Sequence, residues 1–426
     1  MQYTKNLSSR TKAEIEAVLQ GKKKNWRFFR LPFGPALIAA IAYIDPGNYA
    51  TNIEAGASYG YALLWVVFCA NIIAMLFQSL SAKLGIVTGL NLPQVCHREF
   101  SPWVNWSLWI ASELCAIATD LAEFLGGAIG FSLLFHLPLL VGMLITAVLT
   151  YAVLMLENKG FRPIEIVIAV ALGLVCVCFL AELLIAPVDW GAVGLHIFKP
   201  ELVDRHAVFL AVGIVGATVM PHAIYLHSAL MPLRAEAQND QQKARLIKWS
   251  NWEVGIGLTL AGSVNLAMVI MAASVFHQGH SDVAEIETAY STLYPLLGST
   301  AAGFYLFSLM VSGVSSSVVG TMAGQIIMQG FVGFKIPLLV RRLVTMLPAF
   351  IVVWAGVNST QALLVSQVIL SLVLPVPMTT LLIFTGSKRI MGKFANHRVL
   401  HMIAIFCAAL ILGLNFVLLY LTLTGN

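Results

Sequence analysis

The chain has 426 residues, of which 59% are hydrophobic and only 11% are charged. Its mean hydropathy is +0.84. A soluble domain of this size would need more charge on its wet surface, so the composition excludes a soluble globular protein and indicates an integral membrane protein. The six cysteines are scattered, mostly within apolar segments, which predicts neither a disulfide framework nor a C-x-x-C site.

The first 30 residues form a basic segment that is too long and too polar for a cleavable signal peptide. We predict that residues 1–30 are a cytosolic leader and that residues 31–424 form a single transmembrane domain.

Eleven apolar segments reach the roughly 20 residues that a membrane-spanning helix needs. They lie near 31–58, 60–88, 102–132, 137–156, 163–187, 206–233, 249–277, 293–330, 337–356, 360–386 and 399–423. If the N-terminus is cytosolic, every Lys and Arg except Lys199 and Arg205 falls on the inner side. The positive-inside rule therefore predicts a multi-pass protein of the inner cell membrane with an extracytoplasmic C-terminus. The net charge of +5 reflects this orientation and indicates no nucleic-acid partner.

Two of these spans contain helix-breaking residues at the same depth. Fifteen positions after Arg30 the first span reaches Asp45, which Pro46 and Gly47 follow, and fifteen positions after Arg205 the sixth span reaches Met220. A break in the leading span of each set of five is typical of secondary transporters with inverted repeats. We predict repeat one at about 31–187, repeat two at about 206–386 and an additional helix at about 399–423.

A broken helix leaves carbonyl oxygens without partners, which is tolerated in a membrane only where protein, water or an ion satisfies them. Asp45 supplies an anionic oxygen, and Asn48 supplies an amide oxygen one turn later. Met220 adds a thioether, a soft ligand that favours transition metals and Cd²⁺ over Ca²⁺ or Mg²⁺. The two breaks therefore predict a site for a divalent transition metal.

Three segments carry a resemblance to a known family: DPGN at 45–48, MPHAIYLHS at 220–228 and ELCAIATDLAEFLG at 113–126. They resemble the signature motifs of the Nramp family of proton-coupled divalent-metal transporters, and especially its bacterial manganese-transporting branch. The resemblance covers about 31–424. It implies an all-α, leucine-transporter-type fold of five plus five helices with spans 1 and 6 broken, and symport of protons with Mn²⁺, Fe²⁺ and also Cd²⁺. It also implies that the carbonyls of Ala42 and Ala217 complete the metal site and that Gln367 joins as the carrier closes.

The third span carries acidic residues that would be costly in hydrocarbon unless they had partners. Glu113, Asp120 and Glu123 are spaced by seven and three, which places them on one helical face. The predicted partners are the cations Arg234, Arg341 and Arg342. By resemblance, this network leads protons from the metal site to the cytosol, and the alternative is a set of ion pairs that only ties helices together.

Two histidines of the sixth span are further candidates for proton coupling. His222 could be a metal ligand, a proton carrier or a structural donor, and we expect proton coupling because imidazole titrates near neutral pH. His227 is also a candidate, although a polar residue inside a span, such as His227 or Gln78, can equally be a buried hydrogen-bond partner.

Two other function classes remain open. A symporter of the same fold could carry Mg²⁺ or an amino acid, but Asp45 would repel a substrate carboxylate, and Met220 is an unexpected ligand for Mg²⁺. An intramembrane metalloenzyme would need a pair such as H-E-x-x-H within a span, and none occurs. We therefore expect a transporter rather than an enzyme, with divalent metal ions, protons and lipid as partners, no permanently bound cofactor and no obligate protein partner.

Overall fold

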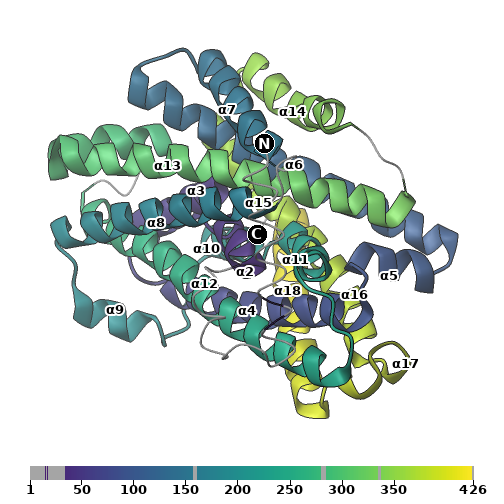
Figure 1. The fold of residues 1–426 in the computed structure, drawn as a ribbon. Helices are drawn as coiled ribbons and strands as arrows, with labels where there is room; N and C mark the ends of the chain where they lie inside the picture. Colours follow the sequence, from purple (N-terminus) through teal and green to yellow (C-terminus); the bar gives the residue numbers. More distant parts are fainter. Residues whose placement is uncertain are drawn as a thin grey trace.

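The computed structural model of the chain describes residues 15, 17, 34–156, 161–279, 285–333 and 337–424. The predicted leader at 1–30, except for residues 15 and 17, lies outside the described residues, as do Lys159, Asp282 and Lys335 of the predicted loops. Regular secondary structure in the described ranges is entirely helical (Figure 1), which confirms the all-α prediction.

The first part of the chain begins with a helix that is interrupted in its middle. Its helices are α2 (Pro35–Ala42), α3 (Pro46–Tyr59), α4 (Leu64–Thr88), α5 (Leu92–Glu99), α6 (Pro102–Phe135), α7 (Leu139–Leu154), α8 (Phe161–Ile185) and α9 (Trp190–His196). Proline occupies the first turn of α2, α3, α5 and α6, where its missing N–H removes no helical hydrogen bond.

The second part repeats the interrupted start. Its elements are α10 (Arg205–Thr218), α11 (Pro221–Arg234), α12 (Asp240–Val275), α13 (Ile286–Val332), α14 (Leu338–Trp354), α15 (Ser359–Val373), α16 (Pro375–Gly386), α17 (Lys388–Met391), the 3₁₀ turn Gly392–Phe394 and α18 (Arg398–Thr424). Pro375 begins α16 and divides the predicted tenth span, because proline lacks the N–H that would continue the hydrogen-bond ladder.

Eight helical segments in the described part of the chain are long and apolar enough to cross a membrane. The first predicted span is not among them because its break leaves two short helices, α2 and α3. α7 has 16 residues and α14 has 17, so both are shorter than the eight. The count of eleven spans and the limits of the two repeats therefore stay predictions.

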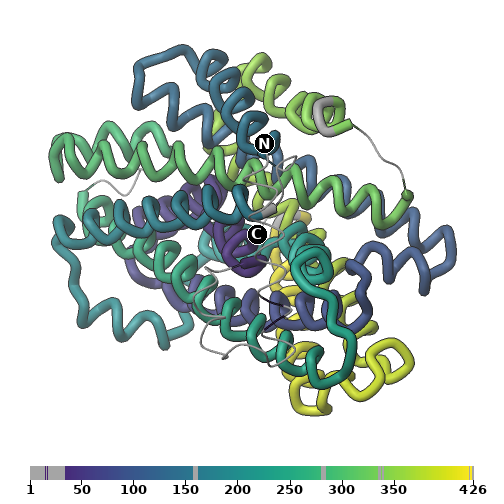
Figure 2. The backbone as a smooth tube through the Cα atoms, in the orientation of Figure 1, coloured from purple at the N-terminus to yellow at the C-terminus, as the bar shows by residue number. Residues whose placement is uncertain are grey.

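Helices from the two parts of the chain pack against each other around the breaks. α3 contacts α10 and α12, α10 contacts α15, and α6 packs along α13. Figures 1 and 2 show α2, α3 and α10 near the middle of the molecule, surrounded by the longer helices. The fold thus brings the breaks of spans 1 and 6 together at the centre.

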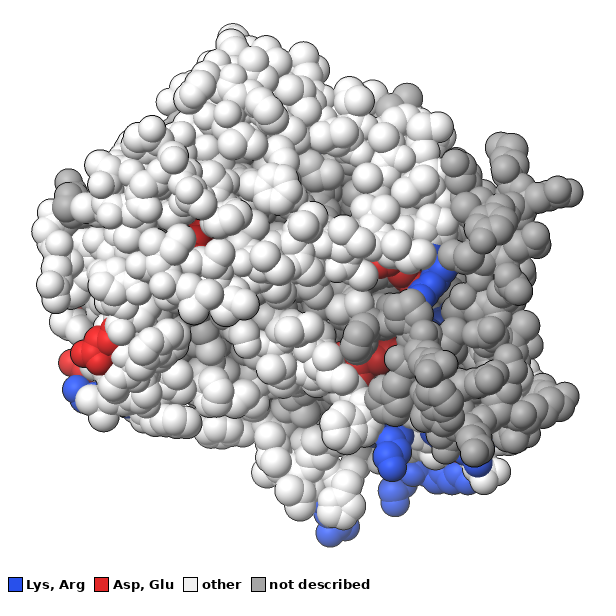
Figure 3. All heavy atoms as spheres, turned by 60° about the vertical axis from the view of Figure 1, so that its left-hand side comes forward, with Lys and Arg blue, Asp and Glu red and all other residues white. Residues whose placement is uncertain are grey.

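Several contacts join segments that the predicted topology places on the same side, and the orientation itself stays a prediction. On the predicted inner side, Lys393 pairs with Asp240 at 2.7 Å and Lys83 donates to Asn396 at 2.7 Å. On the predicted outer side, the indole of Trp65 donates to the carbonyl of Glu201 at 3.2 Å. Most of the surface in Figure 3 bears neither acidic nor basic atoms, and most visible Lys and Arg atoms gather toward the lower right.

Several details of the fold differ from the predicted spans. The short helices α5 and α9 were not predicted, and α12 begins at Asp240, nine residues before the predicted span, because Asn239 caps it by accepting from the backbone of Gln242. α13 runs from 286 to 332 but bends at Gly298, whose φ of 87° is open to glycine and strained for other residues.

Candidate functional site

The break in the first span is built by Asp45 and Pro46. Asp45 adopts an extended backbone, as a residue before proline prefers, and its Oδ1 accepts from the backbone N–H of Asn48 at 2.9 Å. The carboxylate therefore caps α3 while it faces the gap between α2 and α3. The Asp45 side chain is therefore both the N-cap of α3 and a predicted metal ligand.

The break in the sixth span has a different cap. Met220 precedes Pro221 and is also extended, but its side chain makes no capping hydrogen bond. Its side chain is fully buried. The thioether therefore has no hydrogen-bonding task at the helix start, which leaves the sulfur available to a ligand.

Asn48 joins the two breaks. Its Nδ2 donates to Asp45 Oδ1 at 2.6 Å, to the carbonyl of Ala217 at 3.0 Å and to the carbonyl of Tyr43 at 3.2 Å. The hydroxyl of Thr218 donates to Asn48 Oδ1 at 3.4 Å. Oxygen atoms from both broken spans thus converge around one amide, next to the carboxylate.

Ala42 is the last residue of α2, three positions before Asp45, and it is completely buried. The next carbonyl along the chain, that of Tyr43, also accepts from Asn265 Nδ2 of α12 at 2.8 Å. The following carbonyl, that of Ile44, accepts from the Ser312 hydroxyl of α13. Neighbouring helices therefore satisfy the freed backbone at the break, as a membrane interior requires.

Gln367 of α15 lies directly against the first break. A Cβ atom added at Gly47 would lie 1.9 Å from Gln367 Nε2, so only glycine allows this approach. A Cβ at Gly216 of α10 would likewise lie 2.1 Å from the Gln367 carbonyl. Gln367 Oε1 is buried and has no hydrogen-bond partner in the described part of the chain, which makes it a candidate cation ligand.

The whole arrangement is closed to solvent. Asp45 is 1% exposed, and Asn48, Met220 and Gln367 are 0% exposed. Hydrogen bonds therefore join Asp45, Asn48 and Ala217, and Gln367 of α15 lies against the same break, while Met220 is buried at the start of α11. Among the described residues, no group of three or more His, Cys, Asp or Glu side chains could hold a metal, so such a site would depend on amide, carbonyl and thioether ligands.

His222 connects the second break to α6. It is fully buried in the first turn of α11, and its Nδ1 lies 3.1 Å from the hydroxyl of Thr119. Its Nε2 has no hydrogen-bond partner in the described part of the chain. Because Thr119 precedes Asp120, the histidine ring lies close in space to the predicted proton network.

The acids of α6 meet two arginines of α14. Arg341 pairs with Glu113, with Nη2 to Oε2 at 3.0 Å, and Arg342 Nη1 lies 3.9 Å from Asp120 Oδ1. Arg342 also donates to the Ser317 carbonyl of α13 at 3.2 Å. These contacts order the charged groups along one face of α6.

Glu123 is the innermost acid of this row. It is fully buried, and neither carboxylate oxygen has a hydrogen-bond partner in the described part of the chain. A Cβ at Gly320 would lie 2.2 Å from its Oε2, so the carboxylate rests directly on the backbone of α13. A carboxyl group in this position is costly as an anion and far less costly with a proton.

The structure pairs Arg234 with Glu253 of α12 and not with a predicted acid of α6, which corrects the sequence prediction. Its Nη1 donates to both oxygens of Glu253 at 2.8 Å, and the guanidinium lies against Gly34. Glu165 of α8 is also within its electrostatic reach. The reason is local packing: the end of α11 meets α12, where Glu253 accepts from Arg234 and Ser250 lies 3.9 Å from the Met231 sulfur.

His227 belongs to a separate hydrogen-bonded chain. Its Nδ1 lies 2.8 Å from Gln78 Oε1, and Gln78 Nε2 donates to the Tyr43 hydroxyl at 2.6 Å. Tyr43 ends α2. This chain therefore runs from the first break toward α11 and does not contact the α6 acids.

The outer ends of the two half-helices that meet at the site are also linked. His206 Nε2 of α10 lies 3.1 Å from Glu54 Oε1 of α3, and the Tyr59 hydroxyl donates to Asp204 Oδ1 at 2.6 Å. The hydrogen bond from Tyr59, and then that from the Ala207 N–H, lowers the pKa of Asp204. α3 and α10 are thus held together at the predicted outer surface.

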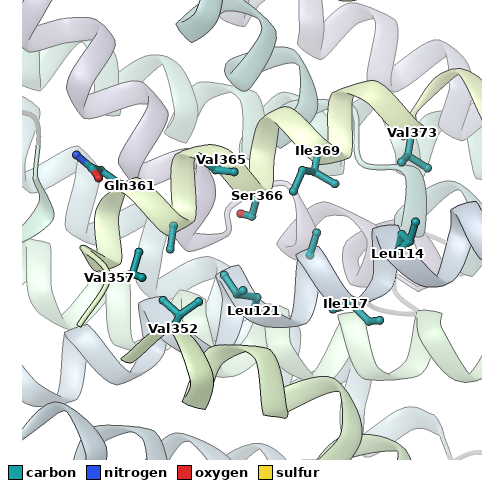
Figure 4. Close-up of a pocket in the computed structure, with 12 residues that line it drawn as sticks. Leu114, Ile117, Leu121, Val352, Val357, Gln361, Val365, Ser366, Ile369 and Val373 are labelled. Atoms are coloured by element: carbon teal, nitrogen blue, oxygen red, sulfur yellow. The ribbon is translucent and has the colours of Figure 1, made fainter. Parts of the chain in front are cut away.

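A groove of about 610 Å³ lies between α6, α14 and α15 (Figure 4). Its lining is aliphatic except for Gln361 and Ser366, so it offers no ligand set for a metal. Ser366 points into the groove and accepts from Gln367 Nε2 at 3.1 Å. The groove therefore flanks the site on the outside of α15 without being part of it.

Sequence reasoning missed Thr119, Tyr43 and Asn265 as partners of the site. Each is polar or aromatic inside an apolar span, but such residues are common in this chain. Only the packing of α6 on α11 and of α12 on α2 shows that these three contact the breaks.

Comparisons with known proteins agree with this geometry. The model of the family described as "natural resistance-associated macrophage protein-like", Nramp, matches residues 36–421. The divalent metal cation transporter MntH of Granulibacter bethesdensis is 59% identical over 414 residues, which are 97% of this chain and 93% of the relative.

Two solved structures show how far the fold is shared. The manganese transporter of Eremococcus coleocola, solved with an aromatic bis-isothiourea compound, has a TM-score of 0.84 and 31% identity, covering 93% of this chain and 88% of the other. MhsT in complex with L-phenylalanine has a TM-score of 0.58 at 15% identity, covering 89% and 98%, and shows the fold alone. The predicted leucine-transporter-type fold is thereby confirmed, and the chain belongs to the Nramp family.

Proposed function

We propose that this protein is a proton-coupled symporter that imports divalent transition-metal ions, namely Mn²⁺, Fe²⁺ and also Cd²⁺, by alternating access. The observation that carries the proposal is the contact between the two breaks: Asn48 bonds both Asp45 and the Ala217 and Thr218 end of α10, two residues before the buried Met220. The relatives that are called divalent metal cation transporters and manganese transporters support the same substrate class.

The proposed ligands suit reversible binding. Asp45 contributes the single carboxylate, Asn48 and Gln367 contribute amide oxygens, and Ala42 and Ala217 contribute carbonyls. Met220 completes the set with a sulfur that favours transition metals. Because one carboxylate cannot neutralise a dication, the ion is held weakly enough to leave.

Transport requires the site to open alternately to each side. In the closed arrangement, α15 approaches the first break through Gly47 and α10 through Gly216. We propose that Gln367 moves with α15 to open the site outward. A dication that moves inward gains about 4.6 kcal/mol per 100 mV, at about 2.3 kcal/mol per charge, so a negative-inside potential favours uptake.

Protons are proposed to leave by a path different from that of the metal. The proposed proton path begins at Asp45 and His222 and continues through the Thr119 hydroxyl to Asp120 and Glu123. It ends at the ion pairs that Arg342 and Arg341 make with the acids of α6. Glu113 is its last acid. The alternative is that these ion pairs only hold α6 to α14. Measuring proton movement in variants of the α6 acids distinguishes the proton path from this structural role.

His227 and Arg234 have other roles in this proposal. His227, through Gln78 and Tyr43, forms a polar branch from the first break toward the predicted inner side. Arg234 holds α11 to α12 through Glu253 and is proposed to stabilise the closed inner end rather than to carry protons.

A symporter for Mg²⁺ or an amino acid remains the second candidate. Met220 disfavours Mg²⁺, which prefers oxygen ligands, and Asp45 disfavours a substrate carboxylate. We further propose that the protein lies in the inner cell membrane with a cytosolic N-terminus, a leader at 1–30 and one transmembrane domain at 31–424.

The test is uptake by the purified full-length protein in liposomes, with Mn²⁺, Fe²⁺, Cd²⁺, Ca²⁺ and Mg²⁺ compared under an imposed pH gradient. We expect Mn²⁺, Fe²⁺ and Cd²⁺ uptake with acidification of the lumen, and no uptake by Asp45→Ala. Asp189→Ala is the matched control, because Asp189 caps the short outer helix α9 and is exposed. Normal Mn²⁺ uptake by well-inserted Asp45→Ala protein would contradict the proposed site.

A further inference from the structure

Glu182, near the outer end of α8, is an acid that the proposed transport path does not use. Its side chain is fully buried, and neither carboxylate oxygen has a hydrogen-bond partner in the described part of the chain. No described cation acts on its charge. A bare carboxylate in such surroundings would be among the most costly groups in the molecule.

Two tyrosines from other helices face this carboxyl group. Tyr49 of α3 and Tyr305 of α13 are within its electrostatic reach, and their ring centroids are 6.0 Å apart. The Tyr49 ring also lies 5.5 Å from Phe179, one turn before Glu182 on α8. The Tyr305 hydroxyl is buried without a hydrogen-bond partner in the described ranges, and the Ser308 hydroxyl of α13 lies beside the buried Tyr49 hydroxyl. Polar groups from three helices thus share one apolar region.

Few other titratable groups act on this cluster. Cys178 lies one turn earlier on α8, and Glu287, at the outer start of α13, acts on Tyr305 rather than on Glu182. From α2 and α12, which also pack against α8, no described titratable group acts on Glu182. Glu182 is therefore the only group of the cluster that would be an anion in water near neutral pH.

The ligand set decides which cation fits. One proton converts the carboxylate to a neutral acid that can also donate a hydrogen bond. A divalent metal would need more ligands than the carboxylate and two phenols of this cluster, whereas two amides, two carbonyls and a thioether stand with Asp45 at the proposed metal site. The cluster is thus built for a proton and not for the transported metal.

We propose that Glu182 is a proton-binding site, separate from the α6 acids, and that its protonation allows α3 to close against α8 and α13. When α3 moves outward, water reaches the carboxylate. On closing, the carboxylate forms an O–H bond with a proton from a hydronium ion, whose O–H bond breaks to leave a water molecule, and on opening it returns the proton to water on the same side. Tyr49 follows Asn48 directly, so one half-helix carries both a metal ligand and a contact to this site. The inference rests on the proposed function for its effect on uptake.

The first test is infrared spectroscopy of the full-length protein in lipid. The stretching band of a protonated carboxyl group is compared between wild type, Glu182→Gln and Glu165→Gln at one neutral pH. Glu165 is the matched control, since it is an acid of the same helix that pairs with Arg162. We expect Glu182→Gln to remove part of the protonated-carboxyl band and Glu165→Gln to leave it unchanged. An unchanged band in Glu182→Gln overturns the inference.

The second test is metal uptake over a series of external pH values. In wild type, uptake on the alkaline limb falls by up to about tenfold per pH unit, because the protonated fraction falls at that rate. Gln at position 182 is neutral at every pH, so in Glu182→Gln the fall of metal uptake should begin at a higher external pH. Glu182→Asp keeps a carboxyl group, so its uptake should still fall as the pH rises. If metal uptake by Glu182→Gln falls over the same pH range as uptake by wild type, the inference is also overturned. Metal uptake by wild type without proton movement would instead refute the proposed symport, and the infrared result would be unaffected.

Discussion

The approach of Gln367 to Gly47 gives a prediction that can be worked from distances. In Gly47→Ala, the new Cβ would lie 1.9 Å from Gln367 Nε2 and 2.2 Å from its Cδ. Real atoms do not come so close, so Gln367 has to move away from the site. Overpacking of this kind costs about 1–3 kcal/mol, which corresponds to about a 5- to 150-fold lower population of the closed arrangement.

The assay is Mn²⁺ uptake in liposomes by four proteins: wild type, Gly47→Ala, Gln367→Ala and the double variant. We expect Gly47→Ala to lower uptake more in the wild-type background than in the Gln367→Ala background, because the two closest contacts are then absent and only the 2.9 Å approach to Asp45 Oδ2 remains. Gly173→Ala is the control, since a Cβ there would meet nothing within 4 Å. An equal loss from Gly47→Ala in both backgrounds would refute the proposed contact.

Three further predictions concern the ligand set, the proton path and the outer surface. Met220→Ala should reduce the preference for Cd²⁺ over Ca²⁺, because it removes the soft sulfur ligand. Met271→Ala, which shortens another fully buried methionine, should leave the preference unchanged. Inhibition of Cd²⁺ uptake by Ca²⁺ measures the preference in both variants. Asp120→Asn and Glu123→Gln should keep metal binding but weaken lumen acidification during uptake, and a wild-type proton-to-metal ratio in both would exclude the α6 path. Because the pKa of Asp204 is lowered in the folded protein, its stabilising effect is present above its ordinary value, near about pH 4, and is lost as the pH falls through the folded value. Thermal unfolding of wild type should therefore lose more stability below about pH 4 than that of Asp204→Asn, and parallel acid limbs would contradict this.

The sequence was sufficient to predict the parts of the fold that depend on local physical chemistry. Hydropathy located the long helices, and proline next to Asp45 and Met220 located both breaks, because proline removes a backbone donor and restricts the preceding residue. The short helix α5 also had a readable signal: Asn91 and Gln94 form a capping box three residues apart.

Contacts between distant helices could not be predicted in the same way. Charge alone made Arg234 a suitable partner for any buried acid, and only the contact between the end of α11 and α12 selects Glu253. Gln367 was predicted as a ligand only through the family resemblance. Its approach to the first break depends on two glycines of other helices, Gly47 and Gly216, which its own local sequence does not reveal. Glu182 drew no attention because nothing in its local sequence reveals that Tyr49 and Tyr305 face it.

The central claim is that a transition metal binds between the two breaks with Asp45 oxygen and Met220 sulfur as ligands. X-ray absorption spectroscopy of Cd²⁺ bound to the purified full-length protein tests it directly. We expect a sulfur atom together with oxygen or nitrogen atoms in the first shell of the wild type, and loss of that sulfur in Met220→Ala. A wild-type shell without sulfur, or a sulfur that persists in Met220→Ala, would contradict the account.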